Sequence, residues 1–386
     1  MPSLSRDGKR DVSVYLHIPF CRRKCVYCDF PSWAGAEDMM EPVTRRMEEE
    51  IASYRGRGLK VREVFFGGGT PSVMPPEKLL RLMRAVRQSL DVDPGAEISM
   101  EINPGTLTGE LLDALQEMGV SRVSMGMQSS SSRLLEMLGR IHRFGDVVRG
   151  VESLRARGIS EINLDLMTGL PSQTMEDVRE SVRDALDLGI PHLSCYSLIP
   201  EEGTVMMDRL QSGEWTLPGE DEERDMVRLC RDMAREKGLE QYEISNYAVP
   251  GHECRYNTRV WRRGEYLGIG CAAAGHLMGV RWTNPMTIRE YLDGAPAERT
   301  VIGPEEARFE TVMLGLRLLE GVREKDFIRD HGMGFEEAFG DGMEKSVREG
   351  LLTLEGGVMR LTERGLDLQN RVLVRMMTDQ GKETAR

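Results

Sequence analysis

The feature that most constrains the fold of this chain is a regular alternation of short apolar, β-branched runs with amphipathic helical stretches. The runs cover residues 12–19, 61–67, 97–103, 122–128, 161–168 and 192–200. Helical patterns lie between them at 37–54, 76–89, 108–118, 131–138, 146–157 and 176–188. Such alternation predicts an α/β fold whose parallel strands are joined by right-handed crossovers. Six units are too few for an eight-stranded barrel, so we expect a partial, open (β/α)6 barrel with reactive groups at its C-terminal strand ends.

The pattern changes after about residue 200, which indicates further units. We expect residues 1–200 to form the barrel, 201–303 an extension or connecting region, and 304–386 a small C-terminal α+β domain. In this last part a helical pattern at 305–319 is followed by apolar segments at 351–354 and 358–361 around Gly356 and Gly357, which predict a β-hairpin. Helices followed by a hairpin resemble a winged helix. Acidic residues outnumber basic ones there, so packing on the barrel is a better expectation than DNA binding.

Composition excludes several classes of protein. The net charge of −12 disfavours nucleic acid and anionic membranes as partners. No uncharged apolar stretch is long enough to span a membrane, and the first twenty residues have no apolar core of a secretory signal. The cysteine count of 7 is odd, and three of these cysteines crowd together, which suits a reduced metal-binding chain better than a disulfide framework. We therefore expect a cytoplasmic protein.

The three clustered cysteines are Cys21, Cys25 and Cys28, in a CxxxCxxC spacing directly after the first predicted strand. Three thiolates on one loop can hold three irons of a 4Fe–4S cubane and leave the fourth iron open. An open iron can chelate the amino and carboxylate groups of a methionine moiety and place a sulfonium beside an electron donor. The spacing therefore predicts a cluster that binds S-adenosylmethionine (SAM) and cleaves it reductively.

The cysteine loop also has two simpler interpretations. A structural zinc site with His17 as the fourth ligand fits less well, because zinc sites usually pair two separated knuckles. The basic residues Arg22, Arg23 and Lys24 could lower thiolate pKa values, or could simply form a solvated loop.

Ordered motifs along nearly the whole chain carry a family resemblance. They read YLHIPFC, CxYCDF, FFGGGTPS, EINPGTL, GMQS, LGRIH, NLDLMTGLPSQT, YSLIPEEGT and QYEISNYAVPGHECR. The chain resembles the radical SAM superfamily, within it the oxygen-independent coproporphyrinogen III oxidase-like family, and most closely the HemW haem chaperone branch. The resemblance implies a radical SAM barrel that binds haem and passes it to an acceptor haem protein. It also implies an electron donor such as flavodoxin or ferredoxin.

Polar and glycine residues at the predicted strand ends are candidates for binding SAM. Glycines allow a ligand to approach the backbone closely, carboxylates suit ribose hydroxyls, and Gln or Arg suits a carboxylate. Taken singly, each polar residue could equally be a helix cap or a surface ion-pair partner. The resemblance implies a SAM-binding role for Tyr15, Tyr27, Gly68, Gly69, Thr70, Glu101, Gln128, Arg140, Asp165 and Ala274. Whether one or two SAM molecules bind stays open.

A haem region is implied by a His-Asn-x-x-Tyr-Trp motif of HemW proteins. The matching stretch runs from Tyr256 to Trp261, and it keeps Asn257 and Trp261 but has Tyr256 in place of the His. Tyrosinate and thiolate can also ligate haem iron, and nearby candidates are Tyr256, Cys254, His252 and His276. The axial ligand, the acceptor and the oligomeric state are not determined by the sequence.

Three functions remain open at this stage. The first is the haem chaperone. The second is a radical SAM methylase or a related C–C bond-forming enzyme, which the altered haem motif favours. The third is an oxygen-independent coproporphyrinogen III oxidase (dehydrogenase); Phe30 opposes it, because true oxidases carry a fourth cysteine there. Cys195, Cys230 and Cys271 have no metal-binding spacing. Cys195 and Cys230 are expected to be buried apolar residues, whereas Cys271 lies in a run of small residues that allows a ligand or helix to approach closely.

Overall fold

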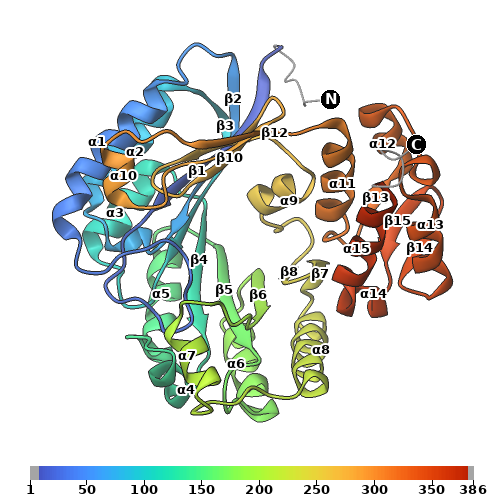
Figure 1. The fold of residues 1–386 in the computed structure, drawn as a ribbon. Coiled ribbons are helices and arrows are strands. Elements are labelled where there is room, and N and C mark those ends of the chain that lie inside the picture. The colour runs from blue at the N-terminus through green and yellow to red at the C-terminus, as the bar shows by residue number, and fades with distance from the viewer. Residues whose placement is uncertain (1–7, 381–386) are drawn as a thin grey trace.

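The computed structural model describes residues 8–380; the outermost ends of the first and last predicted units, 1–7 and 381–386, lie outside them. Six parallel strands stand side by side in chain order (Figure 1). They are β1 (Arg10–Ile18), β2 (Leu59–Gly68), β3 (Asp91–Ile102), β4 (Arg122–Gln128), β5 (Glu161–Thr168) and β6 (His192–Ser197). Within residues 8–380 no barrel closes, because the edge strands β12 and β7 do not pair with each other. The predicted partial α/β barrel is confirmed.

Helices connect these strands and cover one face of the sheet. They are α1 (Met40–Ala52), α2 (Pro76–Ser89), α3 (Gly109–Met118), α4 (Ser132–Met137), α5 (Phe144–Ala156) and α6 (Met175–Asp187), with short 3-10 turns η1 (Glu37–Met39) and η2 (Pro71–Val73). Each longer helix buries one apolar stripe against the strands, such as Leu79, Leu82 and Val86 of α2. Their ends follow local chemistry: the Thr108 side chain accepts from the Leu111 N–H at the start of α3, and Gly119 ends it with a left-handed φ of 71°.

Short strands extend the sheet on both sides, which the sequence did not predict. On one edge β8 (Asn246–Ala248) and β7 (Glu240–Glu243) follow β6, and on the other β9 (Tyr266–Ile269), β10 (Ala274–Leu277), β11 (Val280–Thr283) and β12 (Glu298–Val301) follow β1. These strands have three or four residues each, too few to show a clear alternation. Helices α7 (Val205–Gln211), α8 (Glu220–Glu236), α9 (Arg255–Trp261) and α10 (Ile288–Leu292) lie between them.

The C-terminal part has its own apolar core and lies beside the barrel (red in Figure 1). It contains α11 (Pro304–Gly315), α12 (Glu324–His331), α13 (Phe335–Arg348), α14 (Glu363–Asp367) and α15 (Gln369–Gln380) around a sheet of β13 (Val322–Arg323), β15 (Val358–Leu361) and β14 (Leu352–Glu355). The predicted hairpin is the β14–β15 pair. Backbone bonds from Leu319 N–H to Tyr242 O (3.0 Å) and from Ile244 N–H to Arg317 O (3.2 Å) join it to the barrel.

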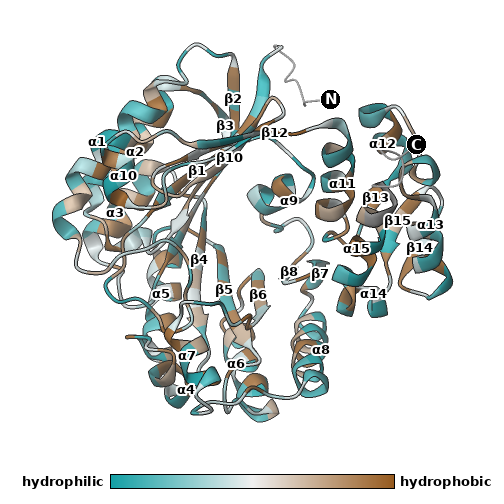
Figure 2. Ribbon diagram, viewed as in Figure 1, coloured by the Kyte–Doolittle hydropathy of each residue, from teal (hydrophilic) through white to brown (hydrophobic). Residues whose placement is uncertain are grey.

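Hydropathy follows this architecture. Along the central strands brown residues alternate with pale and teal ones in Figure 2, whereas the outward faces of the surrounding helices are largely teal. Within residues 8–380 no helix is both long enough and apolar enough to cross a membrane.

Candidate cofactor site

A cavity of about 510 Å³ opens at the C-terminal ends of the parallel strands. The loop after β1 forms one wall, and the ends of β2 to β6 form the others. Most of the predicted site residues line it: Cys21, Cys25, Tyr27, Cys28, Gly68, Gly69, Thr70, Glu101, Gln128, Arg140, Asp165 and Asn257. The fold therefore brings together side chains that are up to 236 positions apart in the sequence.

The cysteine loop is held in place by its backbone. The Cys21 N–H donates to Trp33 O (3.0 Å), which closes the loop on itself. Val26 is fixed from two sides, since its N–H donates to Leu138 O (3.2 Å) and its carbonyl accepts from Met206 N–H (2.9 Å). These bonds position the thiols through protein contacts alone.

The three thiols face one cavity in a mixed electrostatic environment. Burial, with smaller effects of the nearby Cys25 and Cys21, raises the pKa of the Cys28 thiol to about 11, against the lowering effects of the Phe30 backbone and Lys24. Arg140 Nη1 lies 3.5 Å from Cys25 Sγ and can donate to it. Thiolates are the form that binds iron. Ligation must therefore offset the cost of ionising Cys28, whereas Arg140 places a positive charge beside Cys25.

Both ring nitrogens of His17 already lie within hydrogen-bonding distance of other groups. Nδ1 lies 3.1 Å from the Tyr15 hydroxyl and Nε2 2.9 Å from Pro31 O. A zinc site with His17 as its fourth ligand would break one of these bonds. Among residues 8–380 no three His, Cys, Asp or Glu side chains are arranged to hold one metal ion. A cubane is held differently, by one thiolate for each ligated iron.

The glycine run at the end of β2 packs closely against the cysteine loop. Gly68 has a φ of 109°, and a Cβ there would lie 2.5 Å from the His17 ring. A Cβ on Gly69 would lie 2.7 Å from the Phe20 carbonyl oxygen, to which the Thr70 N–H donates (2.7 Å). Besides leaving room for a ligand, these glycines let the end of β2 continue pairing with the start of the cysteine loop.

Two partly buried carboxyl groups face the cavity. Glu101 accepts from the Gly68 N–H (3.1 Å); burial and the neighbouring Asp165 raise its pKa to about 8. Asp165 accepts from Ser124 (3.0 Å) and Asn163 (2.7 Å), and burial raises its pKa as well. Such groups suit the hydroxyl and amino groups of a polar ligand.

Arg140 and Gln128 also line the cavity. Arg140 Nη2 donates to Asn103 Oδ1 (2.7 Å) and to Gly126 O (2.5 Å), so the ends of β3 and β4 and the cysteine loop meet at one guanidinium. Gln128 ends β4 with a left-handed φ of 63°. Backbone conformations that L-residues rarely adopt are often found at ligand sites.

Six of the SAM and haem candidates lie outside this cavity: Tyr15, His252, Tyr256, Trp261, Ala274 and His276. Tyr256 is stacked inside the barrel, with ring centroids 4.8 Å from Phe65 and 6.2 Å from Tyr15. Burial raises its pKa well above the usual value. Trp261 instead lies under Arg317 of the C-terminal part, 4.2 Å from the ring centroid. Ala274 is paired in β10 with Thr283 of β11.

The floor of the cavity is polar, and sequence reasoning missed it. Its residues are Ser99, Arg122, Ser124, Asn163, His192 and Ser194. Most of them stand an even number of positions before a predicted site residue on the same strand, such as Ser99 before Glu101 and Asn163 before Asp165. Because alternate residues of a strand share a face, this period of two was the signal that could have found them.

Arg122 separates this cavity from a second, charged cleft of about 920 Å³ next to α9, and it lines both. Its guanidinium pairs with Glu97 and Glu161, each at 3.2 Å, and donates to His252 O (2.6 Å). Glu97 also accepts from the Arg255 N–H at the start of α9 (3.1 Å). The predicted haem region is thus tied to the strands that carry the SAM candidates.

Known proteins resemble both parts of this chain. The radical SAM superfamily model matches residues 15–185, and the HemN C-terminal domain model matches residues 302–368. A protein named heme chaperone HemW from Lactococcus lactis is 35% identical, with 95% of this chain and 97% of the relative covered. Its namesake from Escherichia coli K12 is 34% identical, with coverages of 94% and 97%. The chain belongs to the HemW family. Its radical SAM domain implies a 4Fe–4S cluster and SAM, and the thiol loop, the glycine cradle and the polar strand ends described above fit both.

The fold of this HemW family member is shared with a more distant enzyme. The solved structure of coproporphyrinogen III oxidase (HemN) from Escherichia coli superposes with a TM-score of 0.84 and 20% identity. The match covers 95% of this chain and 90% of that enzyme. It supports the radical SAM barrel and the placement of the C-terminal part.

Proposed function

We propose that this protein is a cytoplasmic haem chaperone, which binds haem and delivers it to acceptor haem proteins. The observation that carries the proposal is similarity along nearly the whole chain to proteins named heme chaperone HemW. Phe30, at the position where true oxidases have a fourth cysteine, supports a role other than decarboxylating coproporphyrinogen III.

In this proposal the strand-end cavity binds the 4Fe–4S cluster and SAM. Cys21, Cys25 and Cys28 would hold the cluster, whose chemistry when bound is the one-electron reduction of SAM. Arg140 would neutralise a carboxylate beside Cys25, and Glu101 would accept from ligand hydroxyl groups. The remaining predicted contacts, from Tyr15, Tyr27, Gly68, Gly69, Thr70, Gln128, Asp165 and Ala274, are part of the same proposal.

The test is an anaerobic haem titration of the reconstituted protein, followed by transfer to an acceptor apoprotein. We expect saturable binding, seen as a change in the haem absorbance band, and loss of the bound haem when a haem-free acceptor is added. Absence of saturable binding with a fully loaded cluster would overturn the chaperone proposal.

A second candidate is a radical SAM methylase or related C–C bond-forming enzyme. The position of Tyr256 favours it, because the residue that replaces the motif His is stacked between Phe65 and Tyr15 rather than presented at a surface. Mass spectrometry of cell extract incubated with the protein and SAM would reveal a methylated or adenosylated product. Cleavage of SAM that no extract alters would count against it.

A further inference from the structure

The cysteine loop presents an unusual surface for so acidic a molecule. Arg22, Arg23 and Lys24 are consecutive and exposed, and only Asp29 opposes them between Cys21 and Phe30. Lys24 donates to the Phe30 carbonyl (3.1 Å), which fixes the far end of the loop. Within residues 8–380 neither Arg22 nor Arg23 forms an ion pair, although most arginines of this chain do.

Exposed apolar side chains surround the same opening. Phe30 is 56% exposed, Ile199 70% and Tyr196 40%, and all three line the cofactor cavity. Apolar residues gathered at one site, with charges at the rim, are typical of a protein-binding surface.

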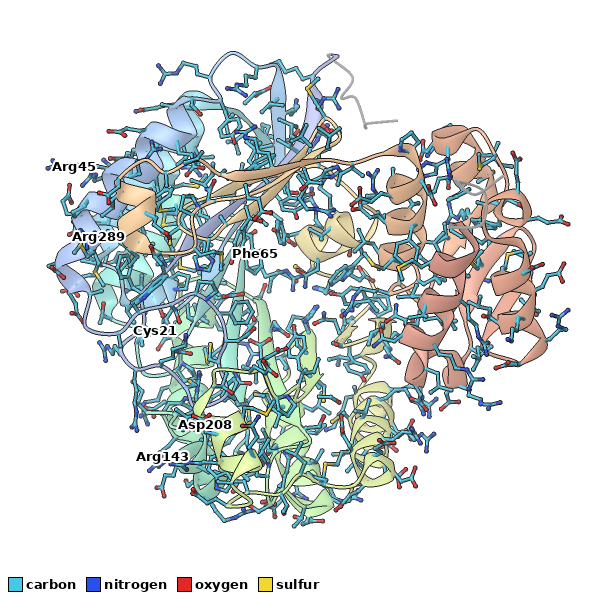
Figure 3. All side chains as sticks on the ribbon, viewed as in Figure 1. Cys21, Arg45, Phe65, Arg143, Asp208 and Arg289 are labelled. Carbon is cyan, nitrogen blue, oxygen red and sulfur yellow. The ribbon has the colours of Figure 1, made fainter. Side chains whose placement is uncertain are left out.

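Among residues 8–380, Arg22, Arg23, Lys24 and Phe30 all have exposed side chains. In Figure 3 Cys21 lies on the left-hand half of the molecule, whereas the C-terminal part occupies the right-hand side. The backbone bonds that hold the loop form without a partner, so the surface is preformed.

The reaction expected at the cysteine loop, the reductive cleavage of SAM, indicates which kind of partner would bind there. Reductive cleavage of SAM consumes one electron for each molecule cleaved. The other four cysteines are buried and do not repeat the triad spacing, so this chain has no second cluster to relay the electron. The electron must therefore enter at this loop, from a donor that approaches it directly.

We propose that Arg22, Arg23, Lys24 and Phe30 form the docking surface for an acidic one-electron carrier protein. The carrier is oxidised by one electron and the cluster is reduced by one. A molecule with a net charge of −12 repels an acidic partner over most of its surface, and an unpaired basic patch would steer it to the one place where transfer is useful. The proposal rests on the cluster assignment in the proposed function, but not on haem binding.

The test measures how fast reduced flavodoxin reduces the cluster in the full-length reconstituted protein, by anaerobic stopped-flow absorbance at low salt. A double variant, Arg22→Glu with Arg23→Glu, should lower the second-order rate constant about tenfold or more, and the difference should shrink at high salt. Phe30→Ala should weaken the binding of oxidised flavodoxin, followed by flavin fluorescence, without adding charge.

Two controls separate an effect on flavodoxin docking from effects of net charge and of the cluster itself. Arg45→Glu with Arg289→Glu makes the same change in net charge at exposed side chains of α1 and α10, outside the cysteine loop, and it should slow flavodoxin less than twofold. Reduced methyl viologen, a small cation that needs no docking surface, should reduce all variants at similar rates. Equal flavodoxin rates in both double variants, or a parallel loss with methyl viologen, would overturn the proposal. A failed haem titration would leave this test unaffected.

Discussion

One carboxyl group in the cofactor cavity, that of Glu101, makes the stability of the fold depend on pH. Glu101 keeps its proton up to about pH 8 because burial and Asp165 disfavour its charge. An unfolded chain would lose that proton near the ordinary value of 4.5. The folded chain therefore binds more protons between these values, and the sign of the linkage is that stability falls as pH rises from about 5 to 8.

Glu101→Gln should remove this dependence in the cofactor-free protein. The amide oxygen can still accept from the Gly68 N–H, but it has no charge to bury. We expect the wild type to lose stability relative to the variant between pH 5 and pH 8, by a few kcal/mol at most. Urea unfolding at the two pH values measures this difference, and parallel pH profiles would contradict the assigned environment of Glu101.

Tyr256 gives a prediction about haem. Because its ring is stacked inside the barrel, Tyr256→Phe should leave haem affinity unchanged in the anaerobic titration. Tyr256→Ala should instead cost about 3 kcal/mol of stability through lost packing. A marked loss of haem in the Phe variant alone would show that the hydroxyl ligates haem in a conformation other than this one.

At the residue scale the sequence could predict most of the candidate site residues but not all of the side chains that pack around them. The cysteine spacing and the strand-end residues were recognisable as a set, and most of them share one cavity. The placement of Tyr256 in the Tyr15–Phe65 stack depends on α9 entering the barrel, a long-range contact that no local pattern encodes.

At the scale of elements, the end of β2 and the cysteine loop behave as one unit. Gly69→Ala would place a Cβ 2.7 Å from the Phe20 carbonyl oxygen, so backbone in the loop must move. We expect the variant to bind less than half the iron of the wild type after reconstitution, with weaker absorbance near the roughly 400 nm band of such clusters.

Gly109→Ala is the matched control for that substitution. It lies at the first position of α3, and a Cβ there meets nothing within 4 Å. It should keep full iron content. Equal iron content in both variants would show that the close packing of Gly69 is not needed to seat the loop.

The long elements were predictable because each shows its period over many residues. The six parallel strands and their helices follow from alternation, capping residues and C-terminal glycines such as Gly119. The short strands β7 to β12 form because an existing sheet offers them edges, and this tertiary cause leaves little trace in three or four residues.

At the scale of the whole molecule, α9 and the C-terminal part share an interface with the barrel. Arg317 pairs with the fully buried Glu243 (3.5 Å) and lies over the Trp261 ring. Arg317→Met would keep some packing but leave the Glu243 charge uncompensated. We expect a loss of about 3 kcal/mol in urea unfolding, as for other broken buried ion pairs.

Arg348→Met is the control within the same part of the chain. Arg348 is exposed and pairs only with Glu344, one helical turn away, so its loss should cost under about 0.5 kcal/mol. Similar stabilities for the two variants would mean that Arg317 does not hold the parts together. The sequence predicted the C-terminal unit but could not show this interface, since its pairs join distant segments.

The central claim is that one cavity brings the three-cysteine cluster and SAM together. The most direct measurement is the electron paramagnetic resonance spectrum of the reduced, reconstituted protein with and without SAM. The account predicts a 4Fe–4S signal that shifts when SAM is added, and that is lost when Cys21, Cys25 or Cys28 is replaced by Ala. A signal that SAM leaves unchanged, or that survives loss of any of these thiols, would contradict it.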